Sequence, residues 1–384
     1  MKRLHYISPS EIPSRSANAI HVINQCNAIA NMGIEVFLYA KRTLNNEDDL
    51  ANEIFKIYGI KSSNLKFLTY FSLSKNAVSL RIALIAIKKC IFSHKDYILA
   101  RNLYAAFILA IVFRRPILFE THQLEYGFKR IIQRFLISCP VVKTILISNK
   151  LLEILSTYHN IKINNYLVLH DAAPSETSPV EESERRKLLC GELNEDINSW
   201  KKVCGYFGHL YDARGIEIII DMATVLPECL FLVYGGNESD VLLYKKSVKL
   251  NNLRFMGYIT HVKTQQIMRL HDVLLMPYQY EVSIGIDFHD TARWMSPMKM
   301  FEYMASGVTV ISSDLPVLRE ILQDGFNALL VEPNDPNAWT SALLSLMHDS
   351  ELPRRLALQA RSDFIKHHTW SIRANKIIAA AEEQ

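Results

Sequence analysis

The sequence predicts an α/β protein made of two doubly wound, Rossmann-like domains, each with a parallel sheet. Three observations support this fold class. Hydrophobic runs of strand length alternate with longer amphipathic segments along most of the chain, which is the pattern of repeated βαβ units. The alternation occurs as two series, separated by a stretch of different composition. The 384 residues also exceed what one hydrophobic core ordinarily organises.

Composition predicts a soluble globular protein and weighs against several functional classes. Hydrophobic residues make up 49% of the chain and charged residues 21%, the balance of packed domains. A net charge of +4 argues against a dedicated nucleic-acid-binding protein. Six cysteines without a CxxC pair indicate neither a zinc site nor a disulfide framework and predict a reducing, cytoplasmic setting. We expect no secretory signal and no membrane-spanning segment.

The first series of elements occupies residues 1–173 and is predicted to form the N-terminal domain. Its expected strands are Leu4–Ile7, Val36–Ala40, Leu65–Phe71, Tyr97–Ala100, Ile117–Phe119, Thr144–Ile147 and Tyr166–Leu169. Apolar residues at helical spacing predict helices at Ala17–Met32, Val78–Phe92, Tyr126–Ile137 and Lys150–His159. Residues 174–199 contain stretches rich in Pro, Ser and Glu, and we expect this region to link the two domains.

The second series, residues 200–369, is predicted to form the C-terminal domain. Its expected strands are Val203–Phe207, Phe231–Tyr234, Leu253–Met256, Val273–Met276, Val308–Ile311 and Ala328–Val331. Helical patterns fill the gaps and continue to the end of the chain. Ligands of such sheets bind at the carboxyl ends of the strands, so we expect the functional groups to cluster in a cleft between the two domains.

The most informative segment is a short helix whose two ends are both marked in the sequence. Ser296 is a good N-cap and Pro297 suits the first helical position, while Gly307 suits a left-handed stop. The start of such a helix favours an anion, and Lys299 and Glu302 share one of its faces. This pattern fits a nucleoside diphosphate, with phosphates at the helix start and ribose on the carboxylate. A capped helix with a surface ion pair fits it equally well.

Other candidate residues follow predicted strands. In residues 205–216 a strand ends at a glycine and Arg214 begins the next helix, which suits phosphate binding or an ordinary glycine-rich turn. Gly235 and Gly236 also follow a strand, where they let a ligand or another backbone approach. His122 comes directly after a buried-strand pattern and suits proton transfer or hydrogen bonding. Any single histidine among the 13 present is still more often structural.

Two segments have interpretations that the residues leave open. The loop from Ser8 to His21, which includes Ser16 and Asn18, faces the predicted cleft and suits either an acceptor site or simple helix capping. The stretch Lys129–Leu136 sets basic residues against an apolar face, which fits an anionic membrane surface. A solvated helix face packed on the sheet is the favoured interpretation of that stretch.

Absent motifs narrow the choice of function further. The chain contains no HExxH, Walker A or GxSxG motif, and no GxGxxG follows the first strand. These absences weigh against a P-loop kinase, a serine hydrolase and a typical dinucleotide oxidoreductase.

Taken together, the motifs resemble the GT-B glycosyltransferases, most closely the large retaining family often called family 4, over almost the whole chain. The similarity is strongest in residues 296–307 and 313–320, and residues 13–22, 120–122 and 205–215 add to it. The resemblance implies two domains facing each other across a cleft, with the last helix, residues 370–384, returning to the first domain. It also implies sugar transfer with retained configuration from a nucleotide sugar, UDP- or GDP-linked, to a glycan or lipid-linked acceptor.

The resemblance further implies no metal ion or other cofactor, no nucleic-acid partner, and a role in cell-surface polysaccharide or glycoconjugate synthesis. Such an enzyme works in the cytoplasm, and peripheral contact with the inner face of the membrane stays open. Carried over by position, His122 touches the transferred sugar, and the loop residues Ser16, Asn18 and His21 border the acceptor. The donor-binding residues are His209, Arg214, Gly236, Tyr258, Met298, Lys299 and Glu302.

Within that donor set the resemblance gives Glu302 the ribose, Arg214 the diphosphate, and Lys299 and Met298 the donor sugar or its phosphates. Tyr258 lies where the family grips the nucleobase.

The sequence departs from the family pattern at two positions. The first of two paired glutamates is replaced by Trp294, with Asp287 and Asp290 nearby, and a diphosphate-binding arginine is replaced by His209. These departures leave open a non-catalytic nucleotide-sugar-binding protein. The shared fold also leaves open another nucleotide-sugar enzyme, such as an epimerase.

Overall fold

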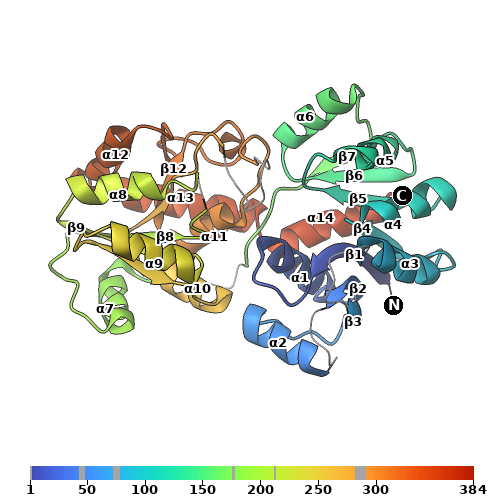
Figure 1. Cartoon of the computed structure of the whole chain (residues 1–384), viewed down its shortest axis with the longest axis horizontal. Coiled ribbons are helices and arrows are strands. Elements are labelled where there is room, and N and C mark those ends of the chain that lie inside the picture. The colour runs from blue at the N-terminus through green and yellow to red at the C-terminus, as the bar shows by residue number, and fades with distance from the viewer. Residues whose placement is uncertain (1, 43–47, 72–77, 175–177, 212, 282–290) are drawn as a thin grey trace. The chain divides into compact units, whose positions relative to one another are not determined.

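The computed structural model describes residues 2–42, 48–71, 78–174, 178–211, 213–281 and 291–384. The chain divides into two compact units (Figure 1). The first comprises Met1–Asp171 and Trp370–Gln384, and the second comprises Ala172–Thr369. Each unit contains one parallel sheet, as the sequence predicts.

The first unit contains a seven-stranded sheet in the order β3-β2-β1-β4-β5-β6-β7. Its strands are β1 (Arg3–Glu11), β2 (Glu35–Arg42), β3 (Leu65–Phe71), β4 (Tyr97–Ala100), β5 (Ile117–Thr121), β6 (Val142–Leu146) and β7 (Tyr166–Val168). Its helices are α1 (Ala17–Ala30), α2 (Asp48–Tyr58), α3 (Val78–Cys90), α4 (Leu103–Phe107), the π-helix η1 (Ile108–Val112), α5 (Phe128–Ile137), α6 (Asn149–His159) and α14 (Trp370–Glu382).

The second unit contains a six-stranded sheet in the order β10-β9-β8-β11-β12-β13. Its strands are β8 (Lys202–Phe207), β9 (Cys229–Tyr234), β10 (Leu253–Gly257), β11 (Val273–Met276), β12 (Thr309–Ser313) and β13 (Leu329–Val331). Its helices are α7 (Glu182–Leu193), α8 (Ile216–Val225), α9 (Glu238–Ser247), α10 (His261–Met268), α11 (Met298–Ser306), the 3-10 helix η2 (Leu318–Glu320), α12 (Pro336–His348) and α13 (Glu351–His367).

Both sheets share one strand order, in which the chain starts at the centre, runs to one edge and then returns to build the other side. This is the doubly wound order, and it creates a switch point beside the first strand where ligands bind. In the second unit the switch point lies between β8 and β11. The loops that follow these two strands are therefore the places to look for a bound nucleotide.

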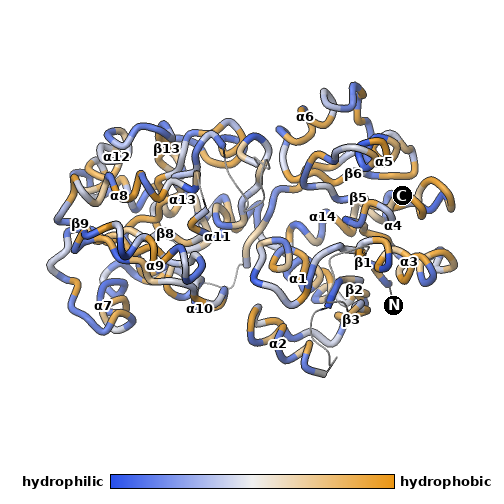
Figure 2. Tube along the Cα trace, in the orientation of Figure 1, coloured by the Kyte–Doolittle hydropathy of each residue, from blue (hydrophilic) through white to orange (hydrophobic). Residues whose placement is uncertain are grey.

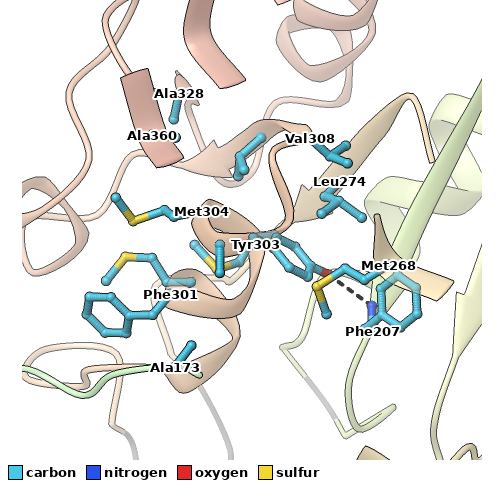
Figure 3. Close-up of a cluster of buried hydrophobic side chains, with 14 of the residues drawn as sticks. Ala173, Phe207, Met268, Leu274, Phe301, Tyr303, Met304, Val308, Ala328 and Ala360 are labelled. Atoms are coloured by element: carbon cyan, nitrogen blue, oxygen red, sulfur yellow. Dashed lines mark hydrogen bonds between the residues drawn. The ribbon is translucent and has the colours of Figure 1, made fainter. Parts of the chain in front are cut away.

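The core of the second unit has helices on both faces of its sheet. Because side chains alternate along a strand, Leu230 and Leu232 of β9 pack in one cluster with Phe301 and Met304. Their neighbours Phe231 and Val233 pack in another cluster that contains Trp339 of α12. Figure 3 shows part of the first cluster, in which α11 supplies several of the buried side chains.

Residues 174–199, expected to be a linker, contribute to the second unit. They include α7, whose Leu189 is fully buried, and Ile197 is buried in the same cluster. Arg185 of α7 also donates a hydrogen bond to the Gly307 carbonyl, with an N···O distance of 2.8 Å. Only Leu189 of α7 is fully buried, and most of its other residues are polar. The composition of this helix therefore resembles that of a connecting segment.

The last helix, α14, lies among the elements of the first unit and contacts α1 (Figure 1). Ala374, Ile377 and Ile378 of α14 are buried in the same cluster as the strands β1 and β2. In the part of the chain that the structure describes, none of the helices has the length and hydrophobicity needed to cross a bilayer.

Gly235 provides a test of how closely the loops of the second unit approach one another. A Cβ at this position would lie 2.0 Å from the Gly208 carbonyl oxygen, and the backbone has φ of +110°. We expect Gly235→Ala to lower the free energy of unfolding by about 3 kcal/mol, through steric overlap and a disfavoured backbone conformation. Urea denaturation of the full chain measures this change.

Gly325→Ala is the matched control for Gly235→Ala. Gly325 also has positive φ, +67°, but a Cβ there has no atom within 4 Å. We expect this substitution to cost only about 1 kcal/mol of unfolding free energy. Equal losses of unfolding free energy in the two variants would show that the close contact between Gly235 and Gly208 does not contribute to the effect of Gly235→Ala.

Candidate functional site

Helix α11 begins one residue later than the sequence predicts. The N-cap is Pro297, with φ of −75° and ψ of 122°, and no side chain caps it. Ser296 therefore precedes the cap, and Pro297 does not occupy the first helical position, because its extended backbone conformation excludes it from the helix. The predicted stop at Gly307 is confirmed, with φ of +69°. The uncapped start retains the electropositive N–H groups that the anion-site interpretation needs.

A buried tyrosine holds α11 against the end of β8. The Tyr303 hydroxyl accepts a hydrogen bond from the Phe207 N–H at 3.0 Å and donates one to the Leu275 carbonyl at 3.3 Å. Figure 3 shows the Tyr303 side chain directed at Phe207. Because Tyr303 is completely buried, these bonds fix α11 relative to the loops that leave β8 and β11.

Lys299 and Arg214 meet at one aromatic ring in this region. The Lys299 ammonium lies 4.7 Å from the Tyr278 ring centroid and 4.1 Å from that of Tyr206. The Arg214 guanidinium lies 5.2 Å from the same Tyr278 ring. Burial, followed by the charge of Arg214, holds the pKa of Lys299 well below its usual range. Two neighbouring cations of this kind favour an anion between them.

The Gly208 loop completes this group of residues. A Cβ at Gly208 would lie 3.1 Å from the Lys299 ammonium nitrogen, so this loop runs directly past the lysine. Residues from the β8 loop, the β11 loop and the start of α11 thus converge at the switch point of the sheet. The structure brings together Arg214 and Lys299, which lie in two separate motifs of the sequence, and places Gly208 beside Lys299.

Glu302 does not form the surface ion pair with Lys299 that was one interpretation of the sequence. Its carboxylate oxygen instead lies 2.6 Å from Nε2 of His261, the first residue of α10. Both side chains are nearly buried, with exposed fractions of 13% for Glu302 and 11% for His261. His261 was missed because no motif surrounds it and the contact spans 41 residues of sequence.

The remaining predicted donor residues have diverse surroundings. The His209 ring stacks on Tyr211 with centroids 4.7 Å apart, and partial desolvation followed by the charges of Arg214 and Lys299 lowers its pKa. A Cβ at Gly236 would meet Leu210 at 2.6 Å, so the glycine admits a protein side chain. Tyr258 is 44% exposed after β10. Met298, the first residue of α11, is half-buried.

Trp294, at one of the two departures from the family pattern, is buried with 9% exposure. It therefore has a packing role in the second unit. Asp287 and Asp290, the two nearby carboxylates, lie outside the described residues.

In the first unit His122 lies just after β5 and beside a buried carboxylate. Its Nε2 is 3.2 Å from an Oε1 of Glu120, and Glu120 is 1% exposed. Burial opposes ionisation of Glu120, but Arg373 and His21 more than compensate and hold its pKa well below the usual range. The ionised carboxylate accepts the Nε2–H of His122, which leaves Nδ1 in its acceptor form.

Five side chains direct hydrogen-bonding groups at Glu120. The Arg373 guanidinium of α14 is nearest at 2.6 Å, and the Tyr6 hydroxyl donates at 2.7 Å. The others, each at 3.2 Å, are His21, Gln25 and His122. The group draws on β1, α1, β5 and α14, so it fixes the position of His122 from several directions.

His21 lies inside this network. It is only 2% exposed, with Nδ1 2.8 Å from Asp171 and Nε2 3.2 Å from Glu120. A carboxylate oxygen thus lies within hydrogen-bond distance of each ring nitrogen. The interpretation of His21 as a loop residue bordering the acceptor is therefore not supported by its surroundings, because the ring points into a buried charge network.

The other two acceptor-side residues have clear local roles. The Ser16 hydroxyl caps α1 by accepting from the Ala19 N–H, and Asn18 donates to the Ser10 hydroxyl at 2.8 Å. The capping interpretation of this loop is thus confirmed for Ser16. That the loop borders an acceptor stays a prediction.

His21, Glu120 and His122 place possible ligand atoms within 4.8 Å of one another, a spacing that suits a metal ion. The charges argue against one. Arg373 already lies 2.6 Å from Glu120 Oε1, where a divalent cation would need to bind. Both ring nitrogens of His21 already lie within hydrogen-bond distance of a carboxylate. The cluster is best described as a charge network that orients His122.

Comparison with known proteins agrees with this geometry. Residues 201–349 match the family described as Glycosyl transferases group 1. The region contains the β8 loop, Arg214, His261, Lys299 and Glu302. The resemblance predicted from the sequence is therefore confirmed.

Individual relatives match over the same half of the chain. The phosphatidyl-myo-inositol mannosyltransferase of Mycobacterium leprae is 26% identical over 173 residues, covering 44% of this chain and 43% of that protein. The D-inositol 3-phosphate glycosyltransferase of Corynebacterium urealyticum is 23% identical over 192 residues, covering 46% of this chain and 42% of that protein. The matched region thus spans less than half the length of either relative.

Solved structures match over the whole chain. HepE of Anabaena, solved in complex with UDP and glucose, has a TM-score of 0.70 at 15% identity, with complete coverage of both chains. A glycosyltransferase of Rickettsia africae has a TM-score of 0.74 at 14% identity, covering 100% of this chain and 98% of its own. The chain therefore has the two-domain GT-B fold.

The environment of His122 predicts a pH-dependent stability. Burial, with a smaller effect of Arg101, lowers the pKa of His122 to about 4, against about 6.5 in an unfolded chain. Because the unfolded state binds the proton first, this residue lowers the free energy of unfolding by about 2 kcal/mol between pH 7 and pH 5. Above pH 7 its contribution is constant.

Urea denaturation at both pH values tests this linkage. The His122→Gln variant has no such group to titrate, so we expect its stability to fall by about 2 kcal/mol less than that of the wild-type chain over the same interval. Parallel pH profiles for the two proteins would contradict the expectation.

Proposed function

We propose that this protein is a retaining glycosyltransferase that moves a sugar from a nucleoside diphosphate donor, UDP- or GDP-linked, to a glycan or lipid-linked acceptor. The observation that carries the proposal is the convergence of Lys299 and Arg214 at an uncapped helix start, with Glu302 one turn deeper. The relatives support it, since they act on inositol-containing acceptors by name. HepE, whose fold is similar, was solved with UDP.

The departing diphosphate is the group that most needs stabilisation in such a transfer. Arg214, Lys299 and the first N–H groups of α11 supply positive charge without a metal ion, in a fixed arrangement that needs little reorganisation during the reaction. A bound diphosphate would also favour the charged form of Lys299, whose pKa is depressed in the unliganded protein. Donor binding then takes up a proton.

Glu302 suits the ribose because a carboxylate accepts hydrogen bonds from two adjacent hydroxyls. One of its oxygens is occupied by His261 at 2.6 Å, and this contact holds the carboxylate in one orientation. His261 is in this sense a positioning residue for Glu302.

His122 suits the transferred sugar because its neutral ring presents Nδ1 as an acceptor for a sugar hydroxyl. Retention of configuration would follow if the acceptor attacks from the face that the diphosphate leaves. We place the reaction in the synthesis of cell-surface polysaccharide or glycoconjugate.

Binding of UDP tests the role of Glu302. We expect Glu302→Ala to weaken UDP binding by about 10- to 100-fold, because charge-assisted bonds to the ribose are lost. His261→Ala should weaken it by a smaller factor, since the carboxylate remains but is no longer oriented. Isothermal titration, preceded by a thermal-shift comparison of UDP, GDP, ADP and CMP, provides the measurement.

Glu192→Ala is the control for the binding series, because this carboxylate in the same unit pairs with an exposed lysine instead. It should bind as the wild-type chain does. Wild-type affinity in the Glu302→Ala variant would remove that residue from the donor site.

Turnover tests the role of His122. We expect His122→Ala to retain UDP affinity within about twofold and to slow UDP release from UDP-glucose or another bound donor by about 100-fold or more. The exposed His94→Ala variant should match the wild-type rate. Unchanged turnover in His122→Ala, with intact folding, would defeat the assignment.

A further inference from the structure

The outer face of α5 is unusual for a helix that packs on a sheet. Ile132 and Leu136 point inward and are buried, as expected. Three further apolar side chains point outward: Phe128 is 73% exposed, Ile131 52% and Phe135 57%. The interpretation favoured from the sequence, a solvated helix face packed on the sheet, fits the buried inner side and the exposed outer side of α5, but three of the exposed side chains are large and apolar. Figure 2 shows hydrophobic and hydrophilic residues in alternation along this helix.

Basic residues lie between these apolar side chains. Lys129, Arg130 and Arg134 are all exposed, and residues 126–138 contain no acidic residue. Arg130 donates to the Tyr158 carbonyl at 2.6 Å and lies 4.2 Å from that ring. Among the described residues, no carboxylate lies within ion-pair distance of Lys129 or Arg134. The charges of Lys129 and Arg134 thus have no ion-pair partner among the described residues of the first unit.

A groove of about 990 Å³ lies along the same face of the first unit. Its lining includes Tyr126, Arg130, Ile131, Arg134, Phe135 and Tyr158. Tyr126 is itself 56% exposed. Because aromatic and aliphatic side chains line the groove together with the guanidinium groups of Arg130 and Arg134, it suits a ligand that has both an apolar part and an anionic group.

We propose that the outer face of α5, with this groove, docks on an anionic lipid membrane. Phe128, Ile131 and Phe135 enter the interface between headgroups and acyl chains, as the apolar face of an interfacial helix does. Lys129, Arg130 and Arg134 pair with lipid phosphates, and aromatic side chains favour this boundary.

The charges favour a membrane over a second copy of the chain. A symmetric dimer would bring this face against itself, so three cations would meet three cations with no acidic residue to offset them. An anionic bilayer complements both kinds of side chain, because its headgroups attract the cations and its acyl chains accept the apolar groups. Lipids are fluid, so no fixed partner is needed for each residue. The proposal does not depend on sugar transfer, since it concerns only the surface of the first unit.

Co-sedimentation of the full chain with lipid vesicles tests the proposal. We expect binding to vesicles of phosphatidylcholine mixed with phosphatidylglycerol, little binding to phosphatidylcholine alone, and weaker binding as salt is raised. The Lys129→Gln/Arg134→Gln double variant should lower the partition constant by about 25-fold, at about fivefold for each charge. Phe128→Ser/Phe135→Ser should lower it by about tenfold or more, also in low salt.

Helix α9 of the second unit offers matched controls. Leu242 and Leu243 are 57% and 65% exposed, and Lys245 and Lys246 follow them on the same helix. The corresponding Leu→Ser and Lys→Gln double variants change the same kinds of residue and should leave vesicle binding unaltered. Circular dichroism and thermal unfolding of every variant report folding independently of lipid.

Three results would overturn the proposal: no binding of the wild-type chain to either vesicle, equal binding to both, or loss of binding in the α9 variants but not in those of α5. Sedimentation velocity adds a fourth. A dimer that dissociates in Phe128→Ser/Phe135→Ser would assign the α5 face to contact between copies.

Discussion

The first unit depends on one buried carboxylate, Glu120. A carboxylate with 1% exposure is tolerated only when its charge is balanced and its oxygens are occupied. Here an arginine, a tyrosine, a glutamine and two histidines meet that requirement. The donors come from β1, α1, α14 and the loop after β5. The buried charge of Glu120 therefore also aligns these parts of the unit. The orientation of His122 is a consequence of this balance.

In the second unit a neutral hydrogen bond, from the Phe207 N–H to the Tyr303 hydroxyl, also holds separate elements together. β8 pairs with β11 only at Cys204 and Gly205, so the N–H of Phe207 would lack a partner at the switch point. The Tyr303 hydroxyl fills that position, and an unpaired buried N–H would cost about 1–3 kcal/mol. β8 and β11 diverge at the switch point, where a ligand is expected to bind. Tyr303 pairs with the Phe207 N–H that this divergence leaves without a strand partner, and it thereby fixes α11, which carries Lys299.

Much of the fold could be predicted from the sequence, because hydrophobic runs and glycine stops are local signals. The strands Leu65–Phe71 and Val273–Met276 have the predicted bounds, and Lys299 lies where an anion site was expected. His261 and Arg373 were missed, since their partners lie 41 and 253 residues away and no local pattern records such contacts. The exposure of three large apolar side chains on α5 was not predicted, because periodicity shows that a helix has two faces without showing which of them is covered.

The position of Arg373 in the chain has a consequence for biosynthesis. The ribosome makes the strands and helices around Glu120 first, then the whole of the second unit, and only afterwards α14. Until that helix emerges, the carboxylate lacks its nearest cationic partner and Ala374 and Ile377 are missing from the core. The first unit therefore cannot complete its core, or the set of contacts that orients His122, until the whole of the second unit has been translated.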